Sequence, residues 1–95
     1  METLDRVKLA LRITTDKLDT DIAADIAACV ADLRVAGITY AAETDPLIFN
    51  AIKLWCKAYQ TDDTTKTAEY LKRYEALKSS LMMAEGYGWE ANDDD

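Results

Sequence analysis

The chain has 95 residues, of which 49% are hydrophobic and 31% are charged, with one proline, three glycines and no histidine. This length suits one small domain, and no run comes near the roughly 18 apolar residues that a membrane helix needs, so no membrane span is predicted. The formal net charge is −7. A protein this acidic is not expected to bind nucleic acid over its general surface, because phosphate affinity rests on lysine and arginine.

Hydrophobic residues at three- and four-residue steps predict two helices in the first half of the chain. The first covers about residues 4–11, with Thr3 as its N-cap. The second begins at an Asp19 or Thr20 cap and ends at Gly37, a residue type that commonly terminates helices. Its apolar stripe consists of Ile22, Ile26, Cys29, Val30 and Leu33.

Two further helices are predicted in the second half. Asp45 followed by Pro46 is typical of a helix start, with a capping side chain before proline at the first helical position. The apolar face of this third helix extends to Tyr59. A polar break over residues 61–65 precedes the fourth helix, which is expected to run from about Thr65 to Ala84.

The helices and the segment after them divide the chain into two parts. Residues 1–84 are predicted to form an all-α domain, a small bundle of four helices of which two are short or medium and two are long. Residues 85–95 carry five acidic side chains and no basic one, and are predicted to form an extended tail that a partner orders. The apolar stripes are wide for so short a chain, so part of their area is expected to be buried against a neighbour.

The residue types that support catalysis or metal binding are poorly represented. Without histidine there is no evident general base for a serine or cysteine nucleophile, so the chain is predicted not to be an enzyme. Cys29 and Cys56 lie in apolar helical patterns and are predicted to be reduced, buried thiols. A calcium-binding loop started at Asp19 would place Val30 where the metal needs a glutamate, so no metal and no cofactor are predicted.

Charge is unevenly distributed along the chain. Residues 1–45 carry 5 basic and 9 acidic side chains, residues 46–84 carry 6 and 4, and residues 85–95 carry none and 5. Opposite charge on the second and fourth helices would suit contacts between copies of the chain. A solvated stripe explains the carboxylates of the second helix equally well. The candidate intersubunit residues are Asp21, Asp25, Asp32, Lys66, Lys72, Arg73 and Lys78.

Two other segments are candidates for partner binding. Trp89, flanked by glycine and acid beyond the last helix, is suited to anchor in a partner's pocket, the alternative being that it folds back onto its own bundle. In the loop after the second helix, Ile38 and Tyr40 either close the end of the bundle or face a partner. The tail candidates are Leu81, Tyr87, Trp89, Glu90, Asp93, Asp94 and Asp95, and the loop candidates are Ile38, Thr39, Tyr40 and Glu43.

The order of these signals is similar to that of a known family. The segments that carry the similarity are Leu11-Arg12-Ile13, Gly37-Ile38, Asp45-Pro46-Leu47-Ile48, Trp55 with Lys57 and Tyr59, and Tyr70-Leu71 with Tyr74. Over about residues 3–84 the chain resembles the small head–tail connector proteins of tailed bacteriophages, also called head completion or adaptor proteins. The resemblance rests on helix lengths and apolar positions.

The resemblance implies a non-enzymatic protein of the virion neck, assembled in the host cytoplasm and needing no cofactor. In that family about a dozen copies form a ring beneath the portal protein, extend the DNA channel and dock a stopper or tail-completion protein. DNA passes through the lumen without specific binding. Family members engage the portal largely through the C-terminal helix and tail, here Leu77 to Asp95. The loop candidates would then face the next neck component.

A second hypothesis comes from the acidic composition. The chain could be an acidic helical binding module that mimics nucleic acid and inhibits a protein that binds it. That role requires carboxylates clustered over one outer face, whereas many acidic residues here lie at helix starts and in the tail.

Overall fold

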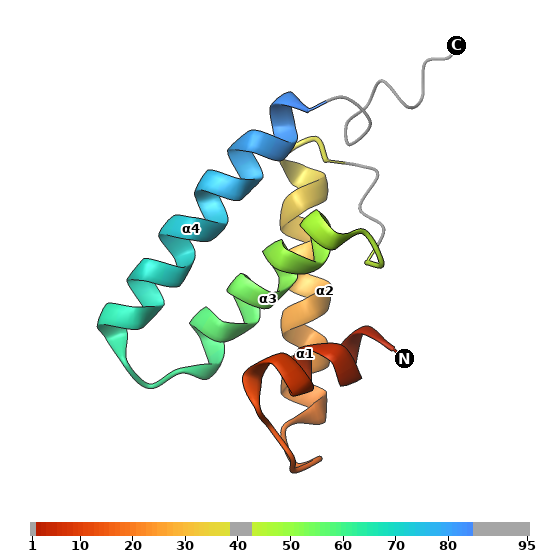
Figure 1. The fold of residues 1–95 in the computed structure, drawn as a ribbon, viewed down its shortest axis with the longest axis vertical. Coiled ribbons are helices and arrows are strands. Elements are labelled where there is room, and N and C mark those ends of the chain that lie inside the picture. Colours follow the sequence, from red (N-terminus) through yellow and green to blue (C-terminus); the bar gives the residue numbers. More distant parts are fainter. Residues whose placement is uncertain (1, 39–42, 85–95) are drawn as a thin grey trace.

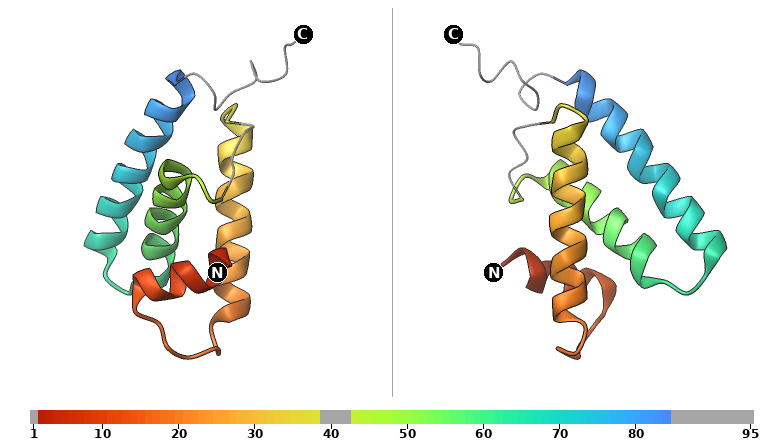
Figure 2. Two further views of the ribbon diagram at one scale, coloured as in Figure 1. Left: turned by 45° about the vertical axis from the view of Figure 1, so that its right-hand side comes forward. Right: turned by 180° about the vertical axis from the view of Figure 1, so that it is seen from behind.

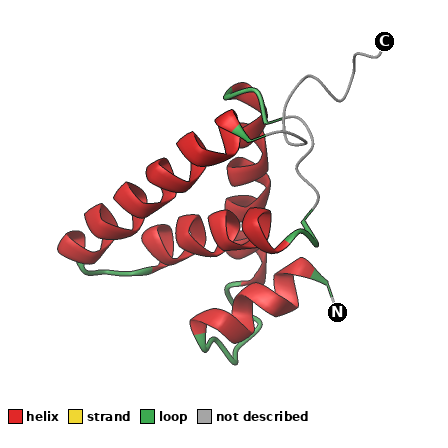
Figure 3. Ribbon diagram, turned by 45° about the horizontal axis from the view of Figure 1, so that its top comes forward, coloured by secondary structure: helices red, strands yellow, loops and turns green. Residues whose placement is uncertain are grey.

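The computed structural model describes residues 2–38 and 43–84. Within these ranges the secondary structure is helical and consists of α1 (Thr3–Leu11), α2 (Asp19–Val35), α3 (Pro46–Gln60) and α4 (Thr64–Met83), joined by loops (Figure 3). The predicted all-α bundle of four helices is confirmed, and the helix boundaries lie close to those expected. None of the described helices is both long and apolar enough to cross a bilayer.

The third helix occupies the centre of the bundle. Helices α2 and α4 lie on either side of α3, and α1 crosses near the beginning of α2 (Figures 1 and 2). The C-terminal ends of α2 and α4 lie at the same end of the molecule, and the two helices diverge toward the beginning of α4. A wedge of this shape leaves the outer faces of α2 and α4 pointing in different directions.

The core forms where the inner faces of the four helices meet. Its buried side chains come from every helix, and burial of each large apolar side chain contributes about 1.5–3 kcal/mol. They include Val7, Ile22, Leu33, Ile48, Ile52, Tyr74 and Leu81. Cys29 and Cys56 are also fully buried and free, as predicted.

Aspartate side chains begin the two C-terminal helices. The Oδ1 atom of Asp45 accepts a hydrogen bond from the backbone N–H of Leu47 at 2.9 Å, and Pro46 occupies the first helical position, as predicted. In the same way, Oδ1 of Asp63 accepts from the N–H of Thr65 at 2.9 Å. Each cap satisfies a backbone donor that the helix itself leaves unpaired.

The predicted caps of the first two helices are wrong. Glu2 and Leu18 occupy the N-cap positions of α1 and α2, and neither makes a side-chain cap hydrogen bond. Both helices begin earlier than their cap residues implied, so Thr3, Asp19 and Thr20 fall inside the first turns. A residue inside the first turn already has helical backbone and cannot cap that turn.

Helix α2 ends just before Gly37, as predicted. Gly37 has φ 95° and donates its N–H to the carbonyl of Arg34 at 3.0 Å, while the N–H of Ile38 reaches the carbonyl of Leu33 at 2.9 Å. This pair of bonds is a Schellman motif, and the buried side chains of Ile38 and Leu33 complete it.

Helix α1 ends in the same way but without a glycine. Arg12 adopts the left-handed conformation, with φ 60° and ψ 38°, and the N–H of Ile13 donates to the carbonyl of Lys8 at 2.9 Å. Among the described residues, Arg12 alone is a non-glycine with positive φ. This conformation costs an L-amino acid about 1–2 kcal/mol.

Candidate functional site

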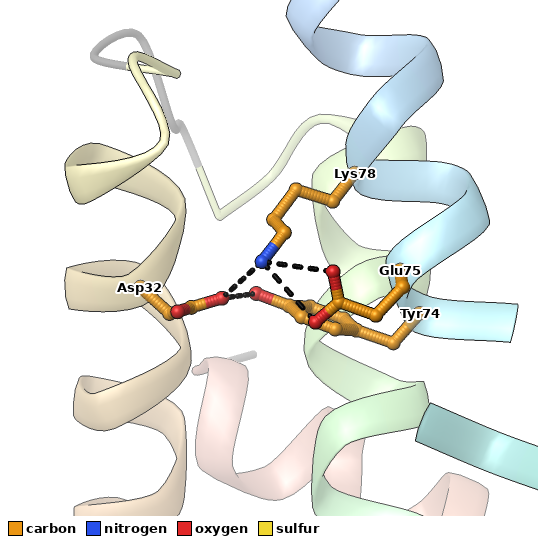
Figure 4. A network of polar contacts seen from close by, with 4 residues as sticks. All are labelled: Asp32, Tyr74, Glu75 and Lys78. Carbon is orange, nitrogen blue, oxygen red and sulfur yellow. Dashed lines mark hydrogen bonds and ion pairs between the residues drawn. The ribbon is translucent and has the colours of Figure 1, made fainter. Parts of the chain in front are cut away.

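A polar network joins the last turns of α2 to the middle of α4 (Figure 4). The hydroxyl of Tyr74 donates to Oδ2 of Asp32 at 2.6 Å, and Nζ of Lys78 donates to the same oxygen at 3.0 Å. Lys78 also pairs with Glu75, one turn earlier on α4, at 3.1 Å. The Tyr74 ring is fully buried in the core and its hydroxyl belongs to the network, so the network lies at the edge of the core.

The contacts of this network fix its protonation states. The hydrogen bond from Tyr74, helped by Lys78, holds the pKa of Asp32 below its usual value against the opposing effect of burial. Burial acts to lower the pKa of Lys78, but its bonds to Asp32 and Glu75 raise it overall. Burial and the hydrogen bond to Asp32 raise the pKa of Tyr74. At neutral pH the network therefore holds a carboxylate, a neutral phenol and an ammonium group.

These contacts change the set of candidate intersubunit residues. Asp32 and Lys78 bind each other within one chain, and Asp25 accepts a hydrogen bond from Nε2 of Gln60 at 2.9 Å. Asp32 and Lys78 are thus paired inside one subunit, and a charge that is already paired interacts more weakly with a neighbour. The remaining candidates are exposed, namely Asp21, Lys66, Lys72 and Arg73.

The outer face of α2 carries small side chains rather than a continuous acidic stripe. Its exposed residues beyond Asp21 include Ala23, Ala24, Ala27, Ala28 and Ala31. An alanine face lets another helix approach closely and bury apolar surface there. The hypothesis of a nucleic-acid mimic is correspondingly weakened, because such a protein needs its carboxylates on an outer face.

Large apolar side chains are exposed where α2 and α4 end. Val35, in the last turn of α2, is 88% exposed, and Met82 and Met83, at the end of α4, are 54% and 86% exposed. Both helices end at the same end of the molecule (Figure 1). We call these three residues the apolar end. Single exposed apolar residues are ordinary, but a group of them at one end is typical of a docking surface.

The structure places the loop and tail candidates in three different environments. Ile38 and Leu81 are fully buried, so they close the bundle and are not available to a partner. Glu43 is exposed and lies with Glu2 along a shallow pocket of about 460 Å³ between α1 and α2. The other candidates lie outside the described residues, namely Thr39, Tyr40, Tyr87, Trp89, Glu90, Asp93, Asp94 and Asp95.

A second pocket, of about 380 Å³, opens at the other end of the bundle. Its walls include Arg12 at the end of α1, Lys57 and Gln60 on α3, and Tyr70 on α4. The Lys57 ammonium lies 5.8 Å from the centroid of the Tyr70 ring, a cation–π contact. We call this site the basic pocket. Sequence reasoning missed it because three separate segments build it; the one local signal was an arginine at a helix stop.

The cysteine thiols and the carboxylates of the described residues show little sign of a reactive centre. Burial raises the pKa of both Cys29 and Cys56 to about 12, which suppresses the nucleophilic thiolate. Within residues 2–38 and 43–84, no three carboxylate or thiol side chains lie close enough together to hold a metal ion.

Comparison with known proteins identifies the family. The model of a family described as phage connector protein matches residues 3–88, a range that contains all four helices. No curated protein and no solved structure matches the chain. The resemblance that the sequence suggested is confirmed at the level of the family. The chain therefore belongs to the phage connector protein family, and its role is that of a structural connector in a bacteriophage particle.

Proposed function

We propose that this protein is the head–tail connector that forms a homo-oligomeric ring beneath the portal, extends the DNA channel and docks the next neck component. The observation that carries the proposal is the family match over all four helices. The outer faces of α2 and α4, the apolar end and the net charge of the chain support this role.

The outer faces of α2 and α4 suit a ring. A ring is built from heterologous contacts, in which one face of a subunit binds a different face of the next. The outer face of α2 offers alanines with Asp21, and the outer face of α4 offers Lys66, Lys72 and Arg73. Burial of apolar area would supply most of the affinity, since exposed ion pairs contribute mainly register and association rate.

The apolar end suits attachment to the portal. Val35, Met82 and Met83 present large side chains that gain free energy when a partner covers them. Methionine adapts its shape to irregular surfaces, which favours it at docking sites. The portal contact would thus involve the end of α4, in keeping with the family resemblance.

The charge of the chain suits a channel for DNA. A net charge of −7 makes the protein repel the phosphate backbone. A lumen that lacks clustered lysine and arginine cannot release counterions from DNA, and that release drives nonspecific adhesion. DNA would therefore pass without being held.

Charge reversal on α4 tests the ring. The double variant Lys72→Glu/Arg73→Glu is expected to weaken and slow assembly in sedimentation velocity runs, with the portal protein present to promote the ring. Lys17→Glu, an exposed charge reversal in the α1–α2 loop, is the control and is expected to assemble like the wild type. Full assembly of the α4 double variant would contradict the proposed interface.

A further inference from the structure

We propose that the basic pocket receives the tryptophan-bearing acidic segment 85–95 of a neighbouring copy. The inference rests on the self-association proposed above. It assigns residues 85–95 to a neighbouring copy, whereas the family resemblance implies a portal contact for this tail, and it leaves the portal contact to the end of α4.

The basic pocket holds two cations that lack acidic partners. The ion pairs of the described residues involve Lys8 and Lys78, so neither Arg12 nor Lys57 takes part in one. No acidic side chain lines the pocket, whereas the whole chain is acidic. Its volume of about 380 Å³ lies within the range of roughly 300–1,000 Å³ that ligand pockets occupy. The pocket is therefore ready for an anionic ligand of side-chain size.

The backbone of Arg12 supports a binding role. Glycine would fit its φ of 60° without strain, and the equivalent position after α2 is Gly37. Strained conformations persist where the side chain serves a purpose that an unstrained residue would not serve. At this position an arginine lines the pocket and adds a cation to it.

The segment 85–95 has the complementary chemistry. It contains Trp89, next to Glu90, and it has five carboxylates with no basic residue. An indole can lie against the aromatic ring of Tyr70 and beneath the cations of the rim, while the carboxylates pair with Arg12 and Lys57. The pocket between α1 and α2, by contrast, is lined by two glutamates and has neither a cation nor an aromatic ring among its lining residues.

The reach of the chain points to a neighbouring copy. Tyr70 lies about 21 Å from Ala84 along α4, at 1.5 Å per residue. The five residues from Ala84 to Trp89 span about 17 Å when fully extended, and reversing direction uses part of that length. Trp89 of the same chain would need a fully extended backbone to approach the pocket, whereas a second copy arranged head to tail supplies it without that constraint.

Fluorescence anisotropy with a labelled peptide of residues 85–95 tests the docking. The receptor is the full-length protein carrying Trp89→Ala, so that its own tails do not compete. Saturable binding is expected, and Lys57→Glu in the receptor should weaken it by about tenfold or more. The matched control Lys53→Glu, one turn earlier on α3 and outside the pocket, should change the affinity by less than about threefold.

The Arg12→Gly variant distinguishes a binding role of the arginine side chain from a purely structural one. It removes a cation from the pocket and also relaxes the backbone, so it should weaken peptide binding while raising the melting temperature. Lack of saturable binding, or an equal loss with Lys53→Glu and Lys57→Glu, would overturn the proposal. An increase in peptide affinity with Arg12→Gly would also contradict it.

Mixing two variants tests whether the contact forms between copies. The Lys57→Glu protein keeps its tail, and the Trp89→Ala protein keeps its pocket. Each alone is expected to sediment as a smaller species than the wild type, and an equimolar mixture should regain association. A mixture that sediments like the two separate variants would contradict docking between copies. These runs omit the portal, so their failure would leave the connector function standing.

Discussion

The hydroxyl of Tyr74 on α4 lies 2.6 Å from Oδ2 of Asp32 on α2, across 42 residues of sequence. This bond and the neighbouring ion pair of Lys78 fasten together two helices that otherwise flank α3. Both helices pack mainly against α3, and this contact joins them directly to each other. In the proposed ring, loss of the contact would therefore affect stability first and the relative position of the two outer faces second.

Tyr74→Phe is predicted to destabilise the fold by about 1–2 kcal/mol. The substitution removes the donor of a hydrogen bond to a charged group, a type of bond worth about 1.5–3 kcal/mol, while Lys78 still pairs with the carboxylate. Urea denaturation followed by circular dichroism measures the loss. Tyr59→Phe is the control, since that ring is 52% exposed. Similar losses in both variants would contradict the role assigned to the Tyr74 hydroxyl.

Acid is predicted to weaken the fold partly through Asp32. The folded pKa of Asp32 lies below the unfolded value of about 3.9, so its contribution is fully present above that value. The contribution is lost as the pH falls toward the folded pKa, because protonation then favours the unfolded chain. Asp32→Asn should be less stable at pH 7 and should lose less free energy of unfolding between about pH 5 and pH 2 than the wild type. Parallel pH profiles of the two proteins would be inconsistent with this.

Arg12→Gly is predicted to stabilise the isolated protein by about 0.5–1 kcal/mol. The gain comes from relief of the left-handed conformation, reduced by the greater freedom of glycine in the unfolded chain. Thermal melts of the wild type and variant measure it. Arg34→Gly, within the regular backbone of α2, should have the opposite sign, because glycine there costs about 1 kcal/mol. A lower melting temperature for Arg12→Gly would show that the arginine side chain stabilises the monomer.

Both cysteines are predicted to resist thiol reagents in the folded protein. Cys29 and Cys56 are fully buried, and burial raises the pKa of each to about 12, so little thiolate is present or accessible at pH 8. Modification by a chromogenic disulfide should proceed at the rate of opening and should become immediate in denaturant. Rapid labelling of one thiol under native conditions would mean that its helix opens locally.

Local signals account for the parts of the fold that the sequence predicted. Asp45-Pro46 and Gly37 act on their own backbone neighbours, so their effects on helix ends could be anticipated without knowing the packing. The N-cap of α2 could not, since the residue there is Leu18, whose side chain makes no cap hydrogen bond.

The polar network and the basic pocket could not be predicted, because their residues come from segments that lie far apart in the sequence. The sequence left Asp32 either in a solvated stripe or in an intersubunit contact, because nothing local indicates that Tyr74 and Lys78 approach it from α4. The basic pocket likewise assembles from the ends of α1 and α3 and one side chain of α4. Helical periodicity identifies which face is buried but not which helix covers it. The family resemblance, by contrast, follows the order and length of the helices, which local sequence patterns determine.

The most direct test of the central claim is an electron microscopy image of the purified protein mixed with the portal protein of the same phage. The account predicts a closed ring of this protein, of about a dozen copies, seated on one end of the portal and continuing its channel. A protein that stays a monomer and leaves the portal undecorated at micromolar concentrations would contradict the account.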